Sequence, residues 1–264
     1  MRRINRTFDR LKKRGQSALI PFIMAGDPDI KTTEALVLRM AEGGADIIEL
    51  GVPFSDPIAD GPTIRAASER ALQNGVNLKE VLDMAERLSG INTPLVLMTY
   101  FNPVLRCGLR DFAESCGRSG VDGVIIPDLP PEEAGPWIAE ARKISLDTIF
   151  LAAPTSPPDR IRLVSRYSRG FIYYVSVTGV TGARENLPDG LEPTVKGIKE
   201  QSKKSVAVGF GISTPDQAKR IGLFADGVIV GSAIIKMIEK NLRHPELTLK
   251  VKDFVSSFAK ALKS

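Results

Sequence analysis

Short apolar runs alternate with segments of helical period along the whole chain. Each apolar run carries residues that favour β-structure and is followed by a turn rich in Gly, Pro or Asp, which is typical of strands that feed into helices. The predicted strands cover residues 18–25, 46–52, 94–100, 123–127, 148–152, 171–177, 205–210 and 227–230.

A segment with helical period follows each predicted strand. Several of these segments have a proline in or near the first turn, where its missing N–H costs little. A further helix, Ile4 to Lys13, precedes the first strand and places Ile4, Phe8 and Leu11 on one face. The helices that follow strands are predicted to begin near Ile30, Thr63, Leu109, Pro131, Pro158, Leu191, Pro215 and Pro245.

Eight strand–helix units indicate a parallel sheet, and a count of eight favours closure into a barrel. The alternative is an open, doubly wound sheet. The first predicted strand, however, ends in Met24-Ala25-Gly26-Asp27-Pro28, without the GxGxxG turn of a dinucleotide-binding sheet. No linker divides the chain. We therefore predict an α/β fold in which residues 1–264 form a single (β/α)8 TIM barrel, with an extra N-terminal helix and a short helix after strand eight.

Composition and charge limit the classes of partner that the chain is expected to bind. The chain has 264 residues, of which 43% are hydrophobic and 25% charged, as in ordinary globular proteins. No apolar run is long enough to span a bilayer, and the basic start has no signal-peptide pattern, so a cytoplasmic protein is expected. The net charge of +5 is spread over segments that also carry acidic residues. No nucleic-acid or membrane partner is therefore expected.

Metal and histidine chemistry find little support in the sequence. His244 is the single histidine, and the spacing of Cys107 and Cys116 fits no common zinc or redox motif. One histidine also leaves no Ser-His-Asp or Cys-His arrangement. No metal site is predicted.

Glycine-rich segments follow the last three predicted strands, at residues 178–182, 209–213 and 230–234. Glycines let backbone N–H groups approach an anion, and the start of a short helix adds a favourable dipole. Any one of these segments could simply form a tight turn. Three of them on neighbouring strands favour the phosphate site that recurs at this end of (β/α)8 barrels.

Carboxylates gather after the second predicted strand. Side chains alternate along a strand, so Glu49 is expected to point into the barrel while Ile48 and Leu50 face the helices. A carboxylate there is costly unless it is paired or has a function, which leaves catalysis or a salt bridge. Asp60, in the following loop beside Asp56, is either catalytic or a helix cap.

Large apolar and aromatic residues stand at the ends of several predicted strands. Each of them alone is best explained by packing at the top of the barrel. Together they would line a flat apolar pocket between the phosphate end and the carboxylates. Asp128, after the fourth strand, is expected to be structural. The pocket candidates are Phe22, Tyr100, Leu151, Tyr173 and Phe210.

Six fragments of the chain resemble the tryptophan synthase α subunit family. Those at 49–57 (ELGVPFSDP) and 59–62 (ADGP) are the most specific, whereas the glycine motifs are shared with other phosphate-binding barrels. The resemblance implies cleavage of indole-3-glycerol phosphate to indole and D-glyceraldehyde 3-phosphate. The remaining fragments are residues 21–28, 179–182, 209–213 and 231–234.

The resemblance also implies roles for individual residues. Glu49 would move the two protons of the reaction, and Asp60 would accept a hydrogen bond from the indole N–H. Tyr173 is similar to the family's tyrosine near the catalytic glutamate, and the loop around Thr181 is expected to close over the substrate. Phe22, Tyr100, Leu151, Thr181 and Phe210 would contact the indole, and Gly182, Gly211, Gly231 and Ser232 the phosphate.

Carboxylate chemistry agrees with what the sequence lacks: no predicted strand contains a lysine for a Schiff base. The resemblance further implies a partner, the pyridoxal-phosphate-dependent β subunit, in an αββα complex, with no cofactor in this chain. The loops after strands two and six would report occupancy to that partner. The alternatives are a free-standing indole-releasing lyase, another barrel acting on a sugar phosphate, and a non-catalytic regulatory subunit.

Overall fold

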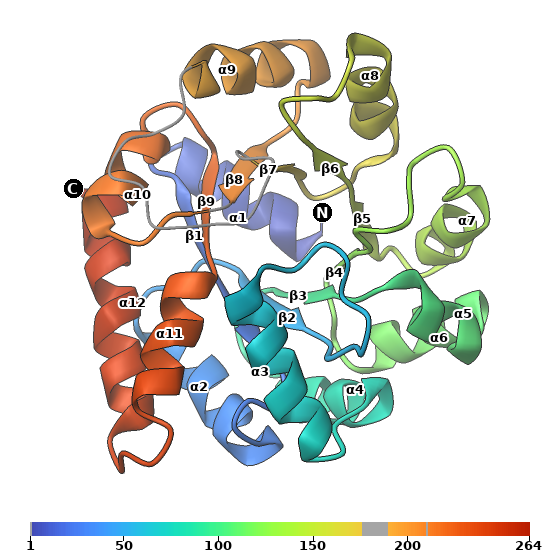
Figure 1. The fold of residues 1–264 in the computed structure, drawn as a ribbon. Coiled ribbons are helices and arrows are strands. Elements are labelled where there is room, and N and C mark those ends of the chain that lie inside the picture. The colour runs from blue at the N-terminus through green and yellow to red at the C-terminus, as the bar shows by residue number, and fades with distance from the viewer. Residues whose placement is uncertain (1, 176–189, 210) are drawn as a thin grey trace.

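The strands close into a ring that helices surround (Figure 1). The computed structural model describes residues 2–175, 190–209 and 211–264. Every strand pair in these residues is parallel. The strands are β1 (Ala18–Met24), β2 (Ile48–Gly51), β3 (Leu95–Met98), β4 (Gly123–Ile125), β5 (Asp147–Ile149), β6 (Leu151–Ala152), β7 (Ile172–Val175), β8 (Val206–Gly209) and β9 (Gly227–Val230).

The ring closes through one segment that Phe150 divides into β5 and β6. β5 pairs with β4 and β6 pairs with β7, while the carbonyl of Phe150 accepts a hydrogen bond from the Tyr173 N–H at 3.1 Å. The strand order therefore runs from β5 through β1 to β6 and returns to the same segment. This confirms the predicted barrel and excludes the open sheet. The single strand predicted over 148–152 is thus interrupted at Phe150.

Helices cover the outside of the ring, and most begin at or close to the predicted residue. Near Pro131 the chain first forms turns, so that helix begins later, at Gly135. The helices are α1 (Arg3–Lys12), α2 (Ile30–Glu42), α3 (Pro62–Gln73), α4 (Leu78–Arg87), α5 (Phe101–Cys107), α6 (Leu109–Arg118), α7 (Gly135–Lys143), α8 (Pro158–Tyr167), α9 (Leu191–Ser202), α10 (Pro215–Gly222), α11 (Ser232–Lys240) and α12 (Leu247–Lys263).

Two of these helices, α4 and α5, were not among the predicted elements. α4 begins with a capping box in which the Asn77 side chain accepts from the Glu80 N–H and the Glu80 carboxylate accepts from the Asn77 N–H. α5 is a short helix whose first N–H, at Phe101, donates to the Asp128 carboxylate. This contact gives Asp128 the structural role expected of it. The short helix predicted after the last strand is present as α11.

The helix α1 closes the bottom of the barrel. Its residues Ile4, Phe8 and Leu11 are buried, as predicted from their common face. They belong to one hydrophobic cluster with inward-facing strand residues such as Ile20 of β1 and Val96 of β3. The ring of Phe8 lies 5.7 Å from that of Phe171, at an angle of 56°. α1 therefore keeps water out of the barrel from the end opposite the strand termini.

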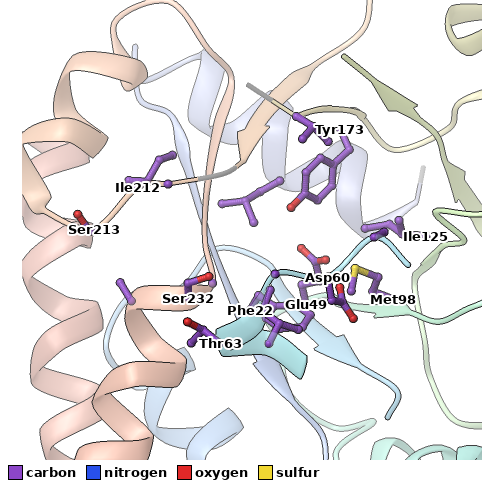
Figure 2. A pocket seen from close by; sticks show the side chains of 18 of the residues that line it. Phe22, Glu49, Asp60, Thr63, Met98, Ile125, Tyr173, Ile212, Ser213 and Ser232 are labelled. Carbon is purple, nitrogen blue, oxygen red and sulfur yellow. The ribbon is translucent and has the colours of Figure 1, made fainter. Parts of the chain in front are cut away.

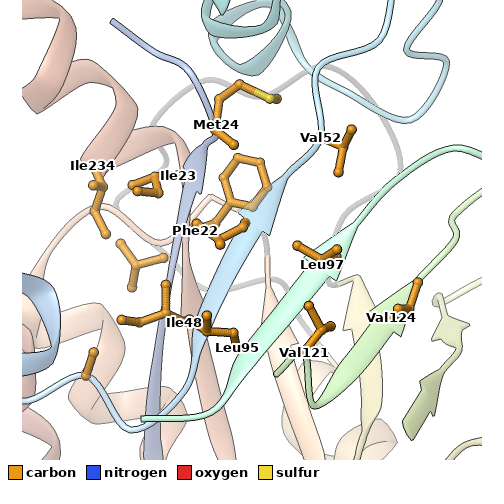
Figure 3. Packing of buried hydrophobic residues seen from close by; sticks show 14 of the residues in the cluster. Phe22, Ile23, Met24, Ile48, Val52, Leu95, Leu97, Val121, Val124 and Ile234 are labelled. Atoms are coloured by element: carbon orange, nitrogen blue, oxygen red, sulfur yellow. The ribbon is translucent and has the colours of Figure 1, made fainter. Parts of the chain in front are cut away.

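A second, larger cluster lies between the outer face of the strands and the helices (Figure 3). Ile48 and Leu50 belong to it, which confirms their predicted outward direction, and Val52 belongs to it as well. Ile23 on β1 lies beside Ile234 on α11 in this layer (Figure 3). This layer holds α11 against the barrel at its carboxyl end.

Truncation of Phe8 tests the importance of the α1 closure. We expect Phe8→Ala to lower the free energy of unfolding by about 3–5 kcal/mol, because it removes a buried ring and leaves a cavity. Urea denaturation followed by circular dichroism measures this loss. Lys12→Ala, on the exposed side of the same helix, is the control and should change stability by less than about 0.5 kcal/mol. Equal effects of the two substitutions would contradict the closure role.

Candidate active site

A cavity opens at the carboxyl end of the barrel, where function concentrates in this fold (Figure 2). Its empty volume is about 1080 Å³, part of which is open solvent. Glu49 and Asp60 lie together in the cavity, with Ser232 and Thr63 to one side of them (Figure 2). The cavity thus brings the predicted acid–base residues and the predicted phosphate end into one space.

Glu49 points into the barrel, as the alternation along β2 predicted. Its backbone is opposite Phe22 of β1 and Val96 of β3, and only 1% of the residue is exposed. Within the described residues, neither carboxyl oxygen has a hydrogen-bond partner. Burial, with a smaller contribution from the charge of Asp60, raises the pKa of Glu49 to about 8. Among the residues that the structure describes, Glu49 forms no salt bridge, the alternative considered from the sequence.

The loop from β2 to α3 holds Asp60 over the end of the barrel. Ser68 of α3 binds the loop at both the N–H and the carbonyl of Phe54. Arg65, also from α3, donates from Nε to the carbonyl of Asp60 at 2.8 Å. The Ala59 N–H donates to the Tyr100 hydroxyl oxygen at 3.0 Å. The backbone on both sides of the Asp60 carboxyl group is thereby fixed.

Asp60 provides the second titratable carboxyl group of the cavity, and its environment differs from that of Glu49. Burial raises its pKa to about 6, and a hydrogen bond with Tyr100 and the charge of Arg65 oppose that rise. At pH 7 the two carboxyl groups therefore differ: Glu49 is mainly protonated and Asp60 mainly ionised. Two carboxyl groups with separated pKa values can act as a proton donor and as a stabiliser of positive charge.

Tyr173 of β7 lies in the cavity near the two carboxyl groups (Figure 2). Burial and the charges of Glu49 and Asp60 raise its pKa well above the ordinary value, so the phenol stays protonated and can donate a hydrogen bond. Its ring packs against Gly209, where an added Cβ would lie 2.7 Å from the hydroxyl oxygen. Glycine at this position of β8 leaves the space for the tyrosine.

The apolar wall of the cavity consists largely of inward strand residues. Phe22 and Leu151 lie there, as predicted. The phenyl ring of Phe22 passes over Gly51, where a Cβ would approach it to 2.7 Å. Sequence reasoning missed several members of the wall, although inward alternation from Glu49 and its strand neighbours provides a signal for the strand residues. These members are Met98, Ile125, Val175, Ile212 and Ile229.

Tyr100 is not among the residues that line the cavity, and its predicted contact with indole stays a prediction. β3 ends at Met98, so Tyr100 is the residue before α5. Its ring stacks on Phe54, with ring centres 5.1 Å apart. Its hydroxyl group instead binds Ala59 and Asp60. The structure thus gives Tyr100 a positioning role for the loop.

The predicted phosphate end is formed by two loops and the start of α11. Gly211, after β8, and Gly231 and Ser232, after β9, all line the cavity. Gly231 is the N-cap of α11, and no described side chain caps this helix. The first N–H groups of a helix carry a partial positive charge and bind anions. This end of the cavity is therefore suited to a phosphate group.

The remaining sequence predictions concern three substrate-contact residues, the second loop aspartate and a metal site. Thr181, Gly182 and Phe210 lie outside the described residues. Asp56 is exposed in the β2–α3 loop, where its carboxylate accepts a hydrogen bond from Ser55. In the part of the chain that the structure describes, no group of three or more His, Cys, Asp or Glu side chains is arranged to hold a metal ion.

Comparison with known proteins identifies the family. The family model for "Tryptophan synthase alpha chain" matches residues 8–263. This chain belongs to that family. The α reaction of the tryptophan synthase α chain family is the cleavage of indole-3-glycerol phosphate, so the chain is a lyase of tryptophan biosynthesis.

Individual tryptophan synthase relatives match along their whole length. The chain is 53% identical to a tryptophan synthase alpha chain of Geobacter sulfurreducens, with 99% of each chain covered. It is 49% identical to that of Geotalea uraniireducens, with 100% of this chain and 99% of the relative covered. A solved structure of Mycobacterium tuberculosis tryptophan synthase is 38% identical, with a TM-score of 0.92 and coverage of 100% of this chain and 99% of the solved chain.

The raised pKa of Glu49 predicts a pH-dependent cost to stability. Between pH 4.5 and 8 the folded chain keeps a proton on Glu49 that the unfolded chain has lost, so stability falls as pH rises through this window. Glu49→Gln removes this dependence. We expect the unfolding free energy of the wild type, minus that of the variant, to fall by about 4 kcal/mol across the window.

Urea titrations at a series of pH values measure this difference. Glu69→Gln, on the exposed face of α3, is the matched control. A wild-type-minus-variant difference that stays constant with pH would mean that Glu49 is ionised in the folded chain.

Proposed function

We propose that Glu49 and Asp60 carry the cleavage of indole-3-glycerol phosphate in this chain, as a proton shuttle and a charge stabiliser. The observation that supports this assignment is that both carboxyl groups are buried and line one cavity, where burial raises the pKa of Glu49 to about 8 and that of Asp60 to about 6. A group that must first give a proton needs to be protonated at neutral pH. A group that stabilises a cation needs to be ionised there.

In the first step protonated Glu49 donates its proton to carbon 3 of the indole ring, which gives an indolenine cation. In the second step the Glu49 carboxylate accepts the proton of the side-chain hydroxyl group. The electron pair of that O–H bond forms the aldehyde carbonyl, the bond between the side chain and carbon 3 breaks, and its electrons restore the aromatic ring. Glu49 ends protonated, ready for the next substrate, and no external oxidant or base is needed.

The Asp60 carboxylate accepts a hydrogen bond from the ring N–H while positive charge develops on the nitrogen. The protonated Tyr173 hydroxyl group lies near the carboxyl pair and can donate a hydrogen bond there. Phe22 and Leu151 flank the indole ring, and the N–H groups at Gly211, Gly231 and Ser232 hold the phosphate. Thr181, Gly182 and Phe210 keep the roles that the family resemblance implies.

The chain acts with a partner, the tryptophan synthase β subunit, in an αββα complex. The exposed β2–α3 loop supports this, because Ile58 beside the Asp60 segment is 75% exposed, as an apolar docking residue would be. Pyridoxal phosphate belongs to that partner, and this chain uses no cofactor of its own. We place residues 1–264 in the cytoplasm as one domain; no described helix is long and apolar enough to cross a membrane.

Indole release tests the proposed roles and separates them from a purely regulatory function. We expect the wild type to release indole slowly alone and much faster with an added tryptophan synthase β subunit. Glu49→Gln is expected to lower kcat by at least about a thousandfold, because general acid–base catalysis is lost, while β-subunit binding persists. Glu69→Gln is the matched control. Unchanged turnover in Glu49→Gln would overturn the assignment, and fast release without the β subunit would favour a free-standing lyase.

Tyr100→Phe tests the positioning of Asp60. The substitution removes the hydrogen bond that lowers the pKa of Asp60, and it leaves the Ala59 N–H without its acceptor. We therefore expect the acidic limb of the kcat profile to move to higher pH by about one unit, with activity better preserved at pH 8 than at pH 6. Tyr167→Phe, remote from the cavity, should leave the profile in place. A uniform loss at every pH would contradict this role.

A further inference from the structure

One cation lines the cavity in the part of the chain that the structure describes, and it is Lys236. It lies on α11, one helical turn after Ser232 at the helix start. Residues four apart lie on the same face of a helix, and their side chains lean toward the N-terminus. We therefore expect the Lys236 side chain to extend along α11 toward the N–H groups of its first turn, which agrees with its place in the cavity lining.

The positive charge of Lys236 is not neutralised by any described residue of the protein. The side chain is exposed, and it has no ion pair or hydrogen bond to any described residue. The acidic residue closest to it along α11, Glu239, is engaged elsewhere: its carboxylate binds Arg70 at 3.0 Å. Arg70 in turn holds the buried Asp27 through two hydrogen bonds of 2.8 Å. Lys236 thus remains available to a ligand in the cavity.

A positively charged side chain would balance the negative charges that meet in the cavity when the substrate binds. Glu49 and Asp60 bring acidic groups to one end, and a phosphate monoester adds between one and two negative charges at neutral pH. The helix start and the glycine N–H groups offer only partial positive charges. A full positive charge on the rim next to Ser232 would offset the phosphate and keep it at the end of the cavity away from the carboxyl pair.

We propose that Lys236 is the counter-ion of the substrate phosphate and sets the preference of the site for phosphorylated over unphosphorylated indole glycerol. This proposal rests on the proposed function. The phosphate does not change during the carbon–carbon cleavage, so Lys236 contributes equally to the ground state and the transition state. It therefore governs KM and leaves kcat nearly unchanged.

Steady-state kinetics with indole-3-glycerol phosphate test this role. We expect Lys236→Gln to raise KM about tenfold with kcat changed less than twofold, and Lys236→Arg to restore most of the affinity. Lys240→Gln, one turn further along α11 and outside the cavity lining, is the matched control for the loss of one charge. The inhibition constant of glycerol 3-phosphate should rise as KM does, whereas that of indole, which has no charge, should not change.

Two outcomes would overturn the proposal: the same KM in Lys236→Gln and Lys240→Gln, or an equal loss of affinity for glycerol 3-phosphate and for indole. The second outcome would indicate a general distortion of the cavity. Calorimetric titration of glycerol 3-phosphate into the wild type and both variants separates this proposal from the proposed function. Lys236-dependent binding without any indole release would refute the catalytic assignment and leave the counter-ion role intact.

Discussion

The burial of the Glu49 carboxyl group is the constraint on which the site depends. The Glu49 carboxyl group lies inside the barrel with no hydrogen-bond partner among the described residues, and it keeps its proton because the charged form loses its hydration. The closed ring of strands surrounds Glu49 from the sides, and α1 excludes water from below. The acid–base function is thus a consequence of barrel closure, and weaker closure would lower the pKa of Glu49 toward its ordinary value.

The pKa of the second carboxyl group, that of Asp60, differs from the pKa of Glu49 because of the loop that carries Asp60. Asp60 is held by contacts from Arg65 of α3 and from Tyr100, and both residues stabilise its ionised form. The rigid outer layer between strands and helices fixes α3 and α11 against the same barrel end (Figure 3). The carboxyl pair and the phosphate end are therefore set at a constant separation, which is how a scaffold orients a substrate without changing shape.

Much of this arrangement follows from the sequence, because strand alternation and turn residues are local signals. The period of two along β2 places Glu49 inside and Ile48 outside, as found. Tyr100 could not be placed, because its direction depends on where β3 ends, and that end is set by Asp128 binding the start of α5. Lys236 was missed for a related reason: its access to the cavity depends on how α11 is rotated against the barrel.

Direct titration of Glu49 shows whether its carboxyl group is neutral in the folded chain at pH 7. Carbon-13 NMR of the chain with labelled glutamate, with Glu49→Gln to assign the signal, follows this one carboxyl group in the free protein. We expect the Glu49 signal to remain that of a neutral acid at pH 7 and to change with a midpoint near 8. A midpoint near the ordinary 4.5 would contradict this expectation, because Glu49 would then be ionised at neutral pH and unable to give the first proton.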